Sequence, residues 1–232
     1  MTRLPASVFL VLLFGIQLVA CTTEPDQNNL SLPKLTQKAE AGDAEAQFYL
    51  GFKYYNGQDV PQDLRQAAAW FQKAAEQGDV IAQFNLGVMY ENGQGVSRNS
   101  QQAISWYRRA AEQGHASAQY NLGIMYENGD GVPQDYQQSA SWYRKAAEQE
   151  DRSAQFNLGN MYNEGRGVPQ DTVLAYALLN LAAADRDAEF IRSRNLAAED
   201  MTPEQIEEGD TIASQWRPGQ PLPTSSRTGI FR

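Results

Sequence analysis

The sequence predicts an all-α protein whose helix-turn-helix units stack into an α-solenoid, a right-handed superhelix. Three observations predict this fold class. Similar blocks recur at an offset of 36 residues without gaps, each block carries two apolar stripes with helical spacing, and the turns between the stripes repeat as well. Because a unit of this size cannot bury its apolar face alone, we expect neighbouring units to stack side by side.

The repeat is visible in four aligned blocks, which begin at Gly42, Gly78, Gly114 and Glu150. Positions that are equivalent by this alignment carry the same residue in every block. They include Gly51, Gly87, Gly123 and Gly159, and also Tyr54, Tyr90, Tyr126 and Tyr162. Agreement of this kind over four blocks indicates one structural unit used four times.

The first half of each unit predicts an amphipathic helix. In the second unit the stripe contains Ala82, Leu86, Met89 and Tyr90, which recur at spacings of three and four residues. Asp79 stands at the expected N-cap, and a glycine pair supplies the positive φ that ends a helix. That pair is Gly93 and Gly95.

The second half of each unit predicts another helix on a comparable stripe. In the second unit this stripe contains Ala103, Trp106, Tyr107, Ala110 and Ala111, and Asn99 is its expected cap. The equivalent caps elsewhere are Asp63, Asp135 and Asp171. The recurrent tryptophans Trp70, Trp106 and Trp142 could form a ligand-stacking ladder, but their place on the apolar stripe favours core packing.

The N-terminus resembles the lipid-attachment region of a bacterial lipoprotein. An apolar run from Val8 to Ala20 is too short for a membrane span but fits a secretory signal. It ends in the four residues Leu18, Val19, Ala20 and Cys21, which look like a lipobox. The resemblance implies that Cys21 receives the lipid and that Thr22 directs the protein to the outer membrane. The alternative is an ordinary signal peptide in which Cys21 is incidental.

The repeats resemble the Sel-1-like repeat family, a relative of the tetratricopeptide repeat. The pattern behind the resemblance is AQYNLGIMYENGDGVPQDYQQSASWYRKAAEQE from Ala118. We expect a signal peptide over 1–20, a lipid-attached flexible tether over 21–33, four full repeats with capping helices over 34–217, and a disordered tail over 218–232. After Thr172 the aromatic pair becomes Leu178 and Leu179, and the unit from Asp187 loses the signature, which we interpret as a terminal cap.

Charge and composition exclude several classes of function. The formal net charge is -9, and it would become -10 if Arg3 were removed with the signal. An acidic chain without a basic cluster repels phosphates, so we expect no nucleic-acid partner. One histidine and one cysteine cannot assemble a zinc site or a Cys/His nucleophile pair, so we expect no metal and no cofactor.

The family resemblance implies that the first helices of the units line a concave groove that holds a partner protein. Nine positions at three-residue spacing share nearly one face of these helices. They are Asn85, Val88, Glu91, Asn121, Ile124, Glu127, Asn157, Asn160 and Asn163. The asparagine amides could bind the backbone of an extended peptide, and Glu91 and Glu127 would favour a basic segment. Alternatively, the asparagines hydrogen-bond across adjacent helices and hold the stack together.

An enzyme is the alternative class of function, namely a cell-wall (peptidoglycan) modifying or β-lactamase-like enzyme. His115 stands where other units have Asp43, Asp79 and Asp151, which favours a capping residue over a general base. Glu91 and Glu127 lie one repeat apart, roughly 10 Å between packed helices, which is wide even for an inverting glycosidase. Some cysteine-rich relatives have been called β-lactamase-like, but their disulfide pattern is absent from this sequence.

We therefore expect a non-catalytic interaction scaffold rather than an enzyme. The resemblances together imply a lipoprotein of the bacterial cell envelope, anchored by its N-terminal lipid to the outer membrane and facing the periplasm. Its expected partner is a protein or peptide segment bound in the groove.

Overall fold

The computed structural model describes residues 30–185, 187–223 and 225, and within them the regular structure is helical. The α-helices are α1 (Leu32–Glu40), α2 (Ala44–Asn56), α3 (Leu64–Glu76), α4 (Val80–Asn92), α5 (Ser100–Glu112), α6 (Ala116–Asn128), α7 (Tyr136–Ala147), α8 (Arg152–Glu164), α9 (Thr172–Ala182), α10 (Ala188–Ala198) and α11 (Pro203–Gln215). A short 3-10 helix, η3 (Ala183–Asp185), follows α9. The expected signal peptide and Cys21 lie outside the described residues.

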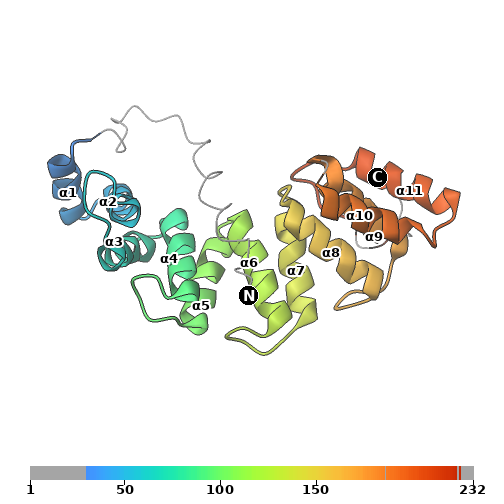
Figure 1. Ribbon diagram of the computed structural model, residues 1–232, viewed down its shortest axis with the longest axis horizontal. Coiled ribbons are helices and arrows are strands. Elements are labelled where there is room, and N and C mark those ends of the chain that lie inside the picture. The colour runs from blue at the N-terminus through green and yellow to red at the C-terminus, as the bar shows by residue number, and fades with distance from the viewer. Residues whose placement is uncertain (1–29, 186, 224, 226–232) are drawn as a thin grey trace.

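The helices follow one another along a curved row, in the order of the chain (Figure 1). Four hairpins form the units, α2/α3, α4/α5, α6/α7 and α8/α9, and the second helix of each unit packs on the first helix of the next. Helix α1 packs on α2 in the same way, so it covers the first unit. The predicted all-α stack of helix-turn-helix repeats is confirmed.

Local chemistry sets the helix ends as the sequence predicts. The Asp79 carboxylate accepts a hydrogen bond of 2.7 Å from the Ala82 amide at the start of α4. Gly93 ends the same helix with a φ of 70°, and only glycine adopts this region without cost. Asn99 caps α5 through its side chain. The residues that start and end these helices are therefore local in the sequence and recognisable from it.

Within each hairpin, a glycine allows the two helices to approach closely. A Cβ atom added to Gly87 of α4 would lie 2.6 Å from the Tyr107 ring of α5. Gly159 of α8 faces Leu179 of α9 in the same way. The large side chain of the second helix therefore fills the space that a side chain on the first helix would need.

Tryptophans connect successive units through the core. Trp106 of α5 is 7% exposed and joins the apolar cluster that contains Phe71 of the preceding unit and Leu86 of its own unit. Trp142 of α7 is buried against the second unit in the same way. The predicted core role of these tryptophans is confirmed. The Arg109 guanidinium also stacks over the Trp106 ring, with 4.4 Å between its central carbon and the ring centroid.

Buried glutamines form a second connection between units, which was not predicted from the sequence. Gln83 of α4 donates to the backbone oxygen of Ala75 at 3.0 Å and accepts from Gln113 at 2.8 Å. One amide therefore joins the end of α3 to the end of α5. Equivalent bonds start from Gln47 and Gln119. Because each buried amide has partners for its nitrogen and oxygen, the stack incurs no penalty for an unsatisfied group.

The C-terminal end departs from the repeat. Helices α10 and α11 each pack on α9, and Gly209 of α11 approaches the Tyr176 ring. The chain then turns back, and Trp216 and Leu222 are each only 4% exposed. The proline-rich surroundings of Leu222 predict a disordered tail, whereas the structure buries this side chain in the apolar cluster around α7 to α9.

Two further observations concern the boundaries of the array. Leu32 and Pro33, which the sequence assigns to the expected tether, belong to the first turn of α1. None of the helices in the described part of the chain is both long enough and apolar enough to cross a membrane.

Candidate functional site

The candidate groove residues lie on the first helices of three successive units. Helix α4 carries Asn85, Val88 and Glu91, helix α6 carries Asn121, Ile124 and Glu127, and helix α8 carries Asn157, Asn160 and Asn163. All nine side chains are half-buried. We call these nine residues the candidate row. The structure leaves each of them partly accessible while neighbouring leucines, such as Leu86 and Leu122, are fully buried.

In the second unit, the row is organised around a buried tyrosine. The Tyr107 hydroxyl of α5 donates a hydrogen bond of 2.5 Å to a carboxylate oxygen of Glu91. The Asn121 side chain of the next unit lies close enough to the same hydroxyl to act on its pKa, which it lowers. Tyr107 therefore brings together two row residues that belong to different units and fixes their orientation.

The third unit repeats this arrangement and adds a cation. The Tyr143 hydroxyl donates to Glu127 at 2.7 Å, and the Asn157 side chain lies close enough to the same hydroxyl to lower its pKa. The Arg166 guanidinium, from the loop after α8, lies 3.3 Å from the other carboxylate oxygen of Glu127. A tyrosine and an arginine thus share the charge of Glu127.

The environment keeps both tyrosines protonated. Burial, followed by the neighbouring Glu91 carboxylate, raises the pKa of the Tyr107 hydroxyl well above its ordinary value. Burial and the hydrogen bond to Glu127 likewise raise the pKa of Tyr143. The two hydroxyls therefore remain hydrogen-bond donors, and they are unsuited to act as bases.

The outer units lack this cluster because their residues differ in a coordinated way. The first unit has Phe71 in place of the tyrosine, and Tyr55 in place of the glutamate. The fourth unit has Leu179 and Asn163 at these two positions. The glutamates were predicted from the sequence as site residues, but their tyrosine partners were missed. The sequence signal for these tyrosines was that tyrosine and glutamate occur together in the second and third units and are both replaced in the first and fourth units.

The two glutamates of the row differ in their electrostatic surroundings. The position of Arg166 relative to Glu127 is occupied, one unit earlier, by Asp130 relative to Glu91. Asp130 is exposed, and it adds negative charge on the side where Arg166 supplies a positive one. Arg166 also lies 2.5 Å from Glu164, and the Nε atom of Arg98 donates to the backbone oxygen of Glu91 at 3.0 Å, so a basic side chain lies beside each of the two glutamates.

The apolar members of the row also have a structural part. Val88 packs against the apolar cluster of the α5 to α7 region, and Ile124 packs against the cluster of the α7 to α9 region. Each of these side chains thus connects its own unit to the following one. The part of each side chain that remains exposed adds apolar surface to the candidate row.

His115 is a helix cap, as its position in the repeat predicts. It stands at the N-cap of α6, where its Nδ1 atom accepts from the Ala118 amide at 3.2 Å. Its ring stacks on Phe84 with 4.6 Å between centroids. Burial lowers the pKa of His115, which favours the neutral imidazole that the cap requires.

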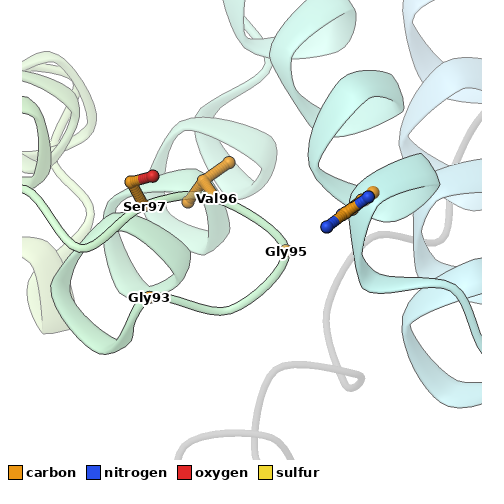
Figure 2. Close-up of a pocket in the computed structure, with 5 residues that line it drawn as sticks. Gly93, Gly95, Val96 and Ser97 are labelled. Carbon is orange, nitrogen blue, oxygen red and sulfur yellow. The ribbon is translucent and has the colours of Figure 1, made fainter.

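One shallow pocket lies just past the C-terminal end of α4, where the loop between α4 and α5 meets the start of α3 (Figure 2). It has a volume of about 330 Å³ and is lined by Arg65, Gly93, Gly95, Val96 and Ser97. A single guanidinium surrounded mainly by backbone provides no acid-base pair. Among residues 30–185, 187–223 and 225, no group of three metal-ligating side chains gathers in one place.

Comparison with known proteins identifies the family. Four consecutive segments match the Sel1 repeat, residues 44–79, 80–115, 116–151 and 152–187. The chain belongs to the Sel1 repeat family. The match covers more than half of the chain and has the same 36-residue period as the four hairpins.

Solved structures with the Sel1 repeat fold resemble this chain. A protective antigen of uropathogenic Escherichia coli, c5321, aligns with a TM-score of 0.72 and 41% identity over 81% of this chain and 40% of its own. A Sel1 repeat protein from Oxalobacter formigenes aligns with a TM-score of 0.64 and 30% identity over 77% of this chain and 83% of its own. The Sel1 fold of the array therefore agrees with known structures.

A curated relative has a described binding activity. The secretory immunoglobulin A-binding protein EsiB of Escherichia coli O6:H1, strain CFT073, is 43% identical over 68 residues, which are 29% of this chain and 14% of EsiB. This chain therefore spans less than half the length of either EsiB or the c5321 antigen. The binding named for EsiB belongs to a much longer protein.

Proposed function

We propose that this Sel1 repeat protein is a non-catalytic scaffold that binds a protein or peptide segment along the candidate row. The observation that carries the proposal is the cluster of Tyr107, Glu91 and Asn121, which holds polar groups of two units in a fixed arrangement at a half-buried surface. Groups that are already ordered lose little conformational freedom on binding, so they can contribute to affinity. EsiB, a relative described as an immunoglobulin A-binding protein, supports this class of function.

The partner segment is expected to carry a basic residue opposite Glu91. The Glu91 carboxylate accepts from the Tyr107 hydroxyl, and Asp130 stands where the next unit has Arg166, whereas the Glu127 carboxylate is paired directly with Arg166. Surface charges of this kind are screened by salt. The proposal therefore includes binding that weakens as the ionic strength rises.

Crosslinking in intact membranes, followed by mass spectrometry, tests the proposal. The variant Glu91→Gln with Asp130→Asn removes two charges while keeping the side-chain shapes, and we expect about tenfold less captured partner, since exposed charge contacts contribute up to about 1 kcal/mol each. The matched control is Glu127→Gln, whose charge is shared with Arg166, and it should have a smaller effect. Unchanged capture by the double variant would exclude the row as the binding surface.

The alternative is an enzyme that acts on peptidoglycan. Its test is direct incubation of the purified protein with peptidoglycan, followed by chromatography of the soluble products. Release of cleaved fragments by the purified chain, combined with failure to capture any protein partner, would replace the scaffold by the enzyme.

The proposal includes a lipid on Cys21 that anchors the scaffold to the outer membrane of a bacterial cell envelope, facing the periplasm. The supporting feature is the run of Leu18, Val19 and Ala20 before the cysteine. Several acyl chains would hold the protein firmly, since each buried methylene contributes about 0.8 kcal/mol. Cys21→Ser should move the protein from the membrane fraction to the soluble fraction, and an unlipidated N-terminus in the membrane-derived protein would contradict the anchor.

A further inference from the structure

The C-terminal segment after α11 shows how this array can hold an extended peptide. Residues Gly219 to Pro223 run beside α7, from its C-terminal end towards its middle. The Gly219 amide donates to the backbone oxygen of Glu148 at 3.0 Å, and the Leu222 amide donates to the Glu148 carboxylate at 2.9 Å. The peptide is thus held through its backbone.

An arginine completes this contact. The Nη1 atom of Arg144 donates to the backbone oxygens of Leu222 and Pro223 at 2.8 and 3.0 Å. Its Nη2 atom donates to the Tyr162 hydroxyl, which holds the guanidinium in place. We call Arg144, Glu148 and Tyr162 the tail clamp. It binds two carbonyls and an amide of a segment in which prolines flank a leucine.

The same three residues occur one unit earlier. Arg108, Glu112 and Tyr126 stand 36 residues before the members of the tail clamp, and we call them the second clamp. The Nη2 atom of Arg108 donates to the Tyr126 hydroxyl at 2.7 Å, which repeats the geometry of the tail clamp. Within the described part of the chain, no backbone oxygen accepts from Arg108.

The tyrosines of the two clamps differ in exposure, as expected if a bound segment covers one tyrosine and not the other. Tyr162 of the tail clamp is 2% exposed, whereas Tyr126 of the second clamp is only half-buried. Tyr126 also lies five residues after Asn121 on α6, which turns it by roughly 140° from that residue. The second clamp therefore belongs to a different face of the array from the candidate row.

We propose that the second clamp binds an extended, proline-flanked segment of a partner protein, in the way that the tail clamp binds the chain's own C-terminal segment. The bound segment presents backbone carbonyls to Arg108 and an amide to Glu112. Prolines favour this occupant because they hold a segment extended before it binds, which lowers the entropy cost.

The junction of the first and second units provides a matched control. It carries Glu76 of α3 and Tyr90 of α4 at the equivalent places but has Gln72 where the clamps have arginine. The Gln72 amide donates to the Glu76 carboxylate at 2.8 Å instead. Substituting Gln72 by arginine should therefore build a third clamp, while substituting Arg108 by glutamine should convert the second clamp into the form found at this junction.

Isothermal titration with a synthetic peptide of the sequence PGQPLPTS, residues 218–225 of this chain, tests the proposal on the full-length protein. We expect one peptide per wild-type chain, at least tenfold weaker binding for Arg108→Gln, and two peptides per chain for Gln72→Arg. Arg144→Gln should retain binding at the second clamp. Equal binding by wild type and Arg108→Gln, or no second peptide for Gln72→Arg, would overturn the proposal.

Two further outcomes distinguish the second clamp from the tail clamp and from the candidate row. Loss of peptide binding in Arg144→Gln but not in Arg108→Gln would mean that the peptide only replaces the chain's own segment, which would overturn the proposal. The row variant Glu91→Gln with Asp130→Asn should bind the peptide as wild type does. The experiments can therefore refute peptide binding at the second clamp without refuting binding along the candidate row, and they can refute binding along the row without refuting the clamp.

Discussion

At the scale of single residues, His115 fills a position that aspartate fills in the other units. Asp79 and Asp151 cap α4 and α8 with carboxylate oxygens, whereas His115 caps α6 with a neutral imidazole nitrogen. Protonation of Nδ1 would remove the acceptor and place a positive charge at the positive end of the helix dipole. The stability that this cap contributes should therefore fall as the pH falls below the ordinary pKa of histidine.

The first prediction concerns this dependence. The pKa of His115 is lowered by burial in the folded protein, so the unfolded chain takes up a proton that the folded chain does not as the pH falls below about 6.5. The folded state should lose stability as the pH falls through this window, by less than about 1.4 kcal/mol per pH unit. Asparagine also caps helices but does not titrate.

Urea unfolding of wild type and His115→Asn at pH 7.5 and pH 5.5 provides the measurement. The difference in unfolding free energy between the two proteins should move in favour of the variant at the lower pH, and the common carboxylates cancel in this difference. An identical difference at both pH values would show that His115 does not titrate differently in the folded and unfolded states.

Single residues also show what could and could not be predicted from the sequence. Asp79 and Gly93 act on groups within a few positions of themselves, so their roles follow from local pattern. Gln83 and Tyr107 act on groups 8 to 30 positions away, and their partners become visible only when helices are placed beside one another. The glutamates of the row were predicted, but the tyrosines that orient them were assigned to the core alone.

At the scale of elements, the segment from Arg217 to Pro223 acts as an additional part of the fold without being a helix or strand. Composition indicated a disordered tail because prolines prevent helix formation. Composition does not show that Arg144 and Glu148 form hydrogen bonds with the backbone of this segment, or that Leu222 has an apolar site. The prediction from the sequence failed here because the binding groups lie 74 to 79 positions away.

The second prediction tests this element. Deleting residues 218–232 should lower the unfolding free energy by about 1.5–3 kcal/mol, because it exposes the apolar site of Leu222. The matched control deletes only residues 226–232 and should leave the stability near that of wild type. Urea unfolding measures both, and equal stability of the two deletions would show that the segment contributes nothing to the fold.

At the scale of the whole molecule, the stack behaves as a row of exchangeable units. Successive units contact one another through equivalent glutamines and glycines, and through equivalent tryptophans up to Trp142. In such an array the stability is roughly a sum of terms for units and for the interfaces between neighbours. Removing a whole unit should shorten the array and keep its interfaces intact.

The third prediction is that deletion of residues 116–151, the third unit, leaves a folded protein. His115 then precedes α8 as it precedes α6 in the full chain, and Arg108 and Glu112 take the places of Arg144 and Glu148 opposite Tyr162. Circular dichroism should show a cooperative unfolding transition at a lower temperature than that of the full chain. Adding Arg108→Gln to the shortened protein should lower its stability further.

The control for this prediction is deletion of residues 116–133, which removes α6 but keeps α7. This half-unit deletion would place two second helices in succession, so their apolar faces could not pair as in the full chain. If both deletions gave equally cooperative transitions, the 36-residue unit would not be the unit of folding.

The turn at Asp59 carries a consequence for how such an array can grow. The equivalent positions in later units are Gly95, Gly131 and Gly167, where a Cβ atom would strike the start of the second helix of the preceding unit. Asp59 adopts a φ of 62° without being glycine, and its carboxylate accepts from the Lys53 ammonium at 2.7 Å. A duplication that inserted a complete hairpin ahead of α2 would bring the start of its second helix against this position, as at Gly95. The array could then extend in that direction only with glycine in place of Asp59.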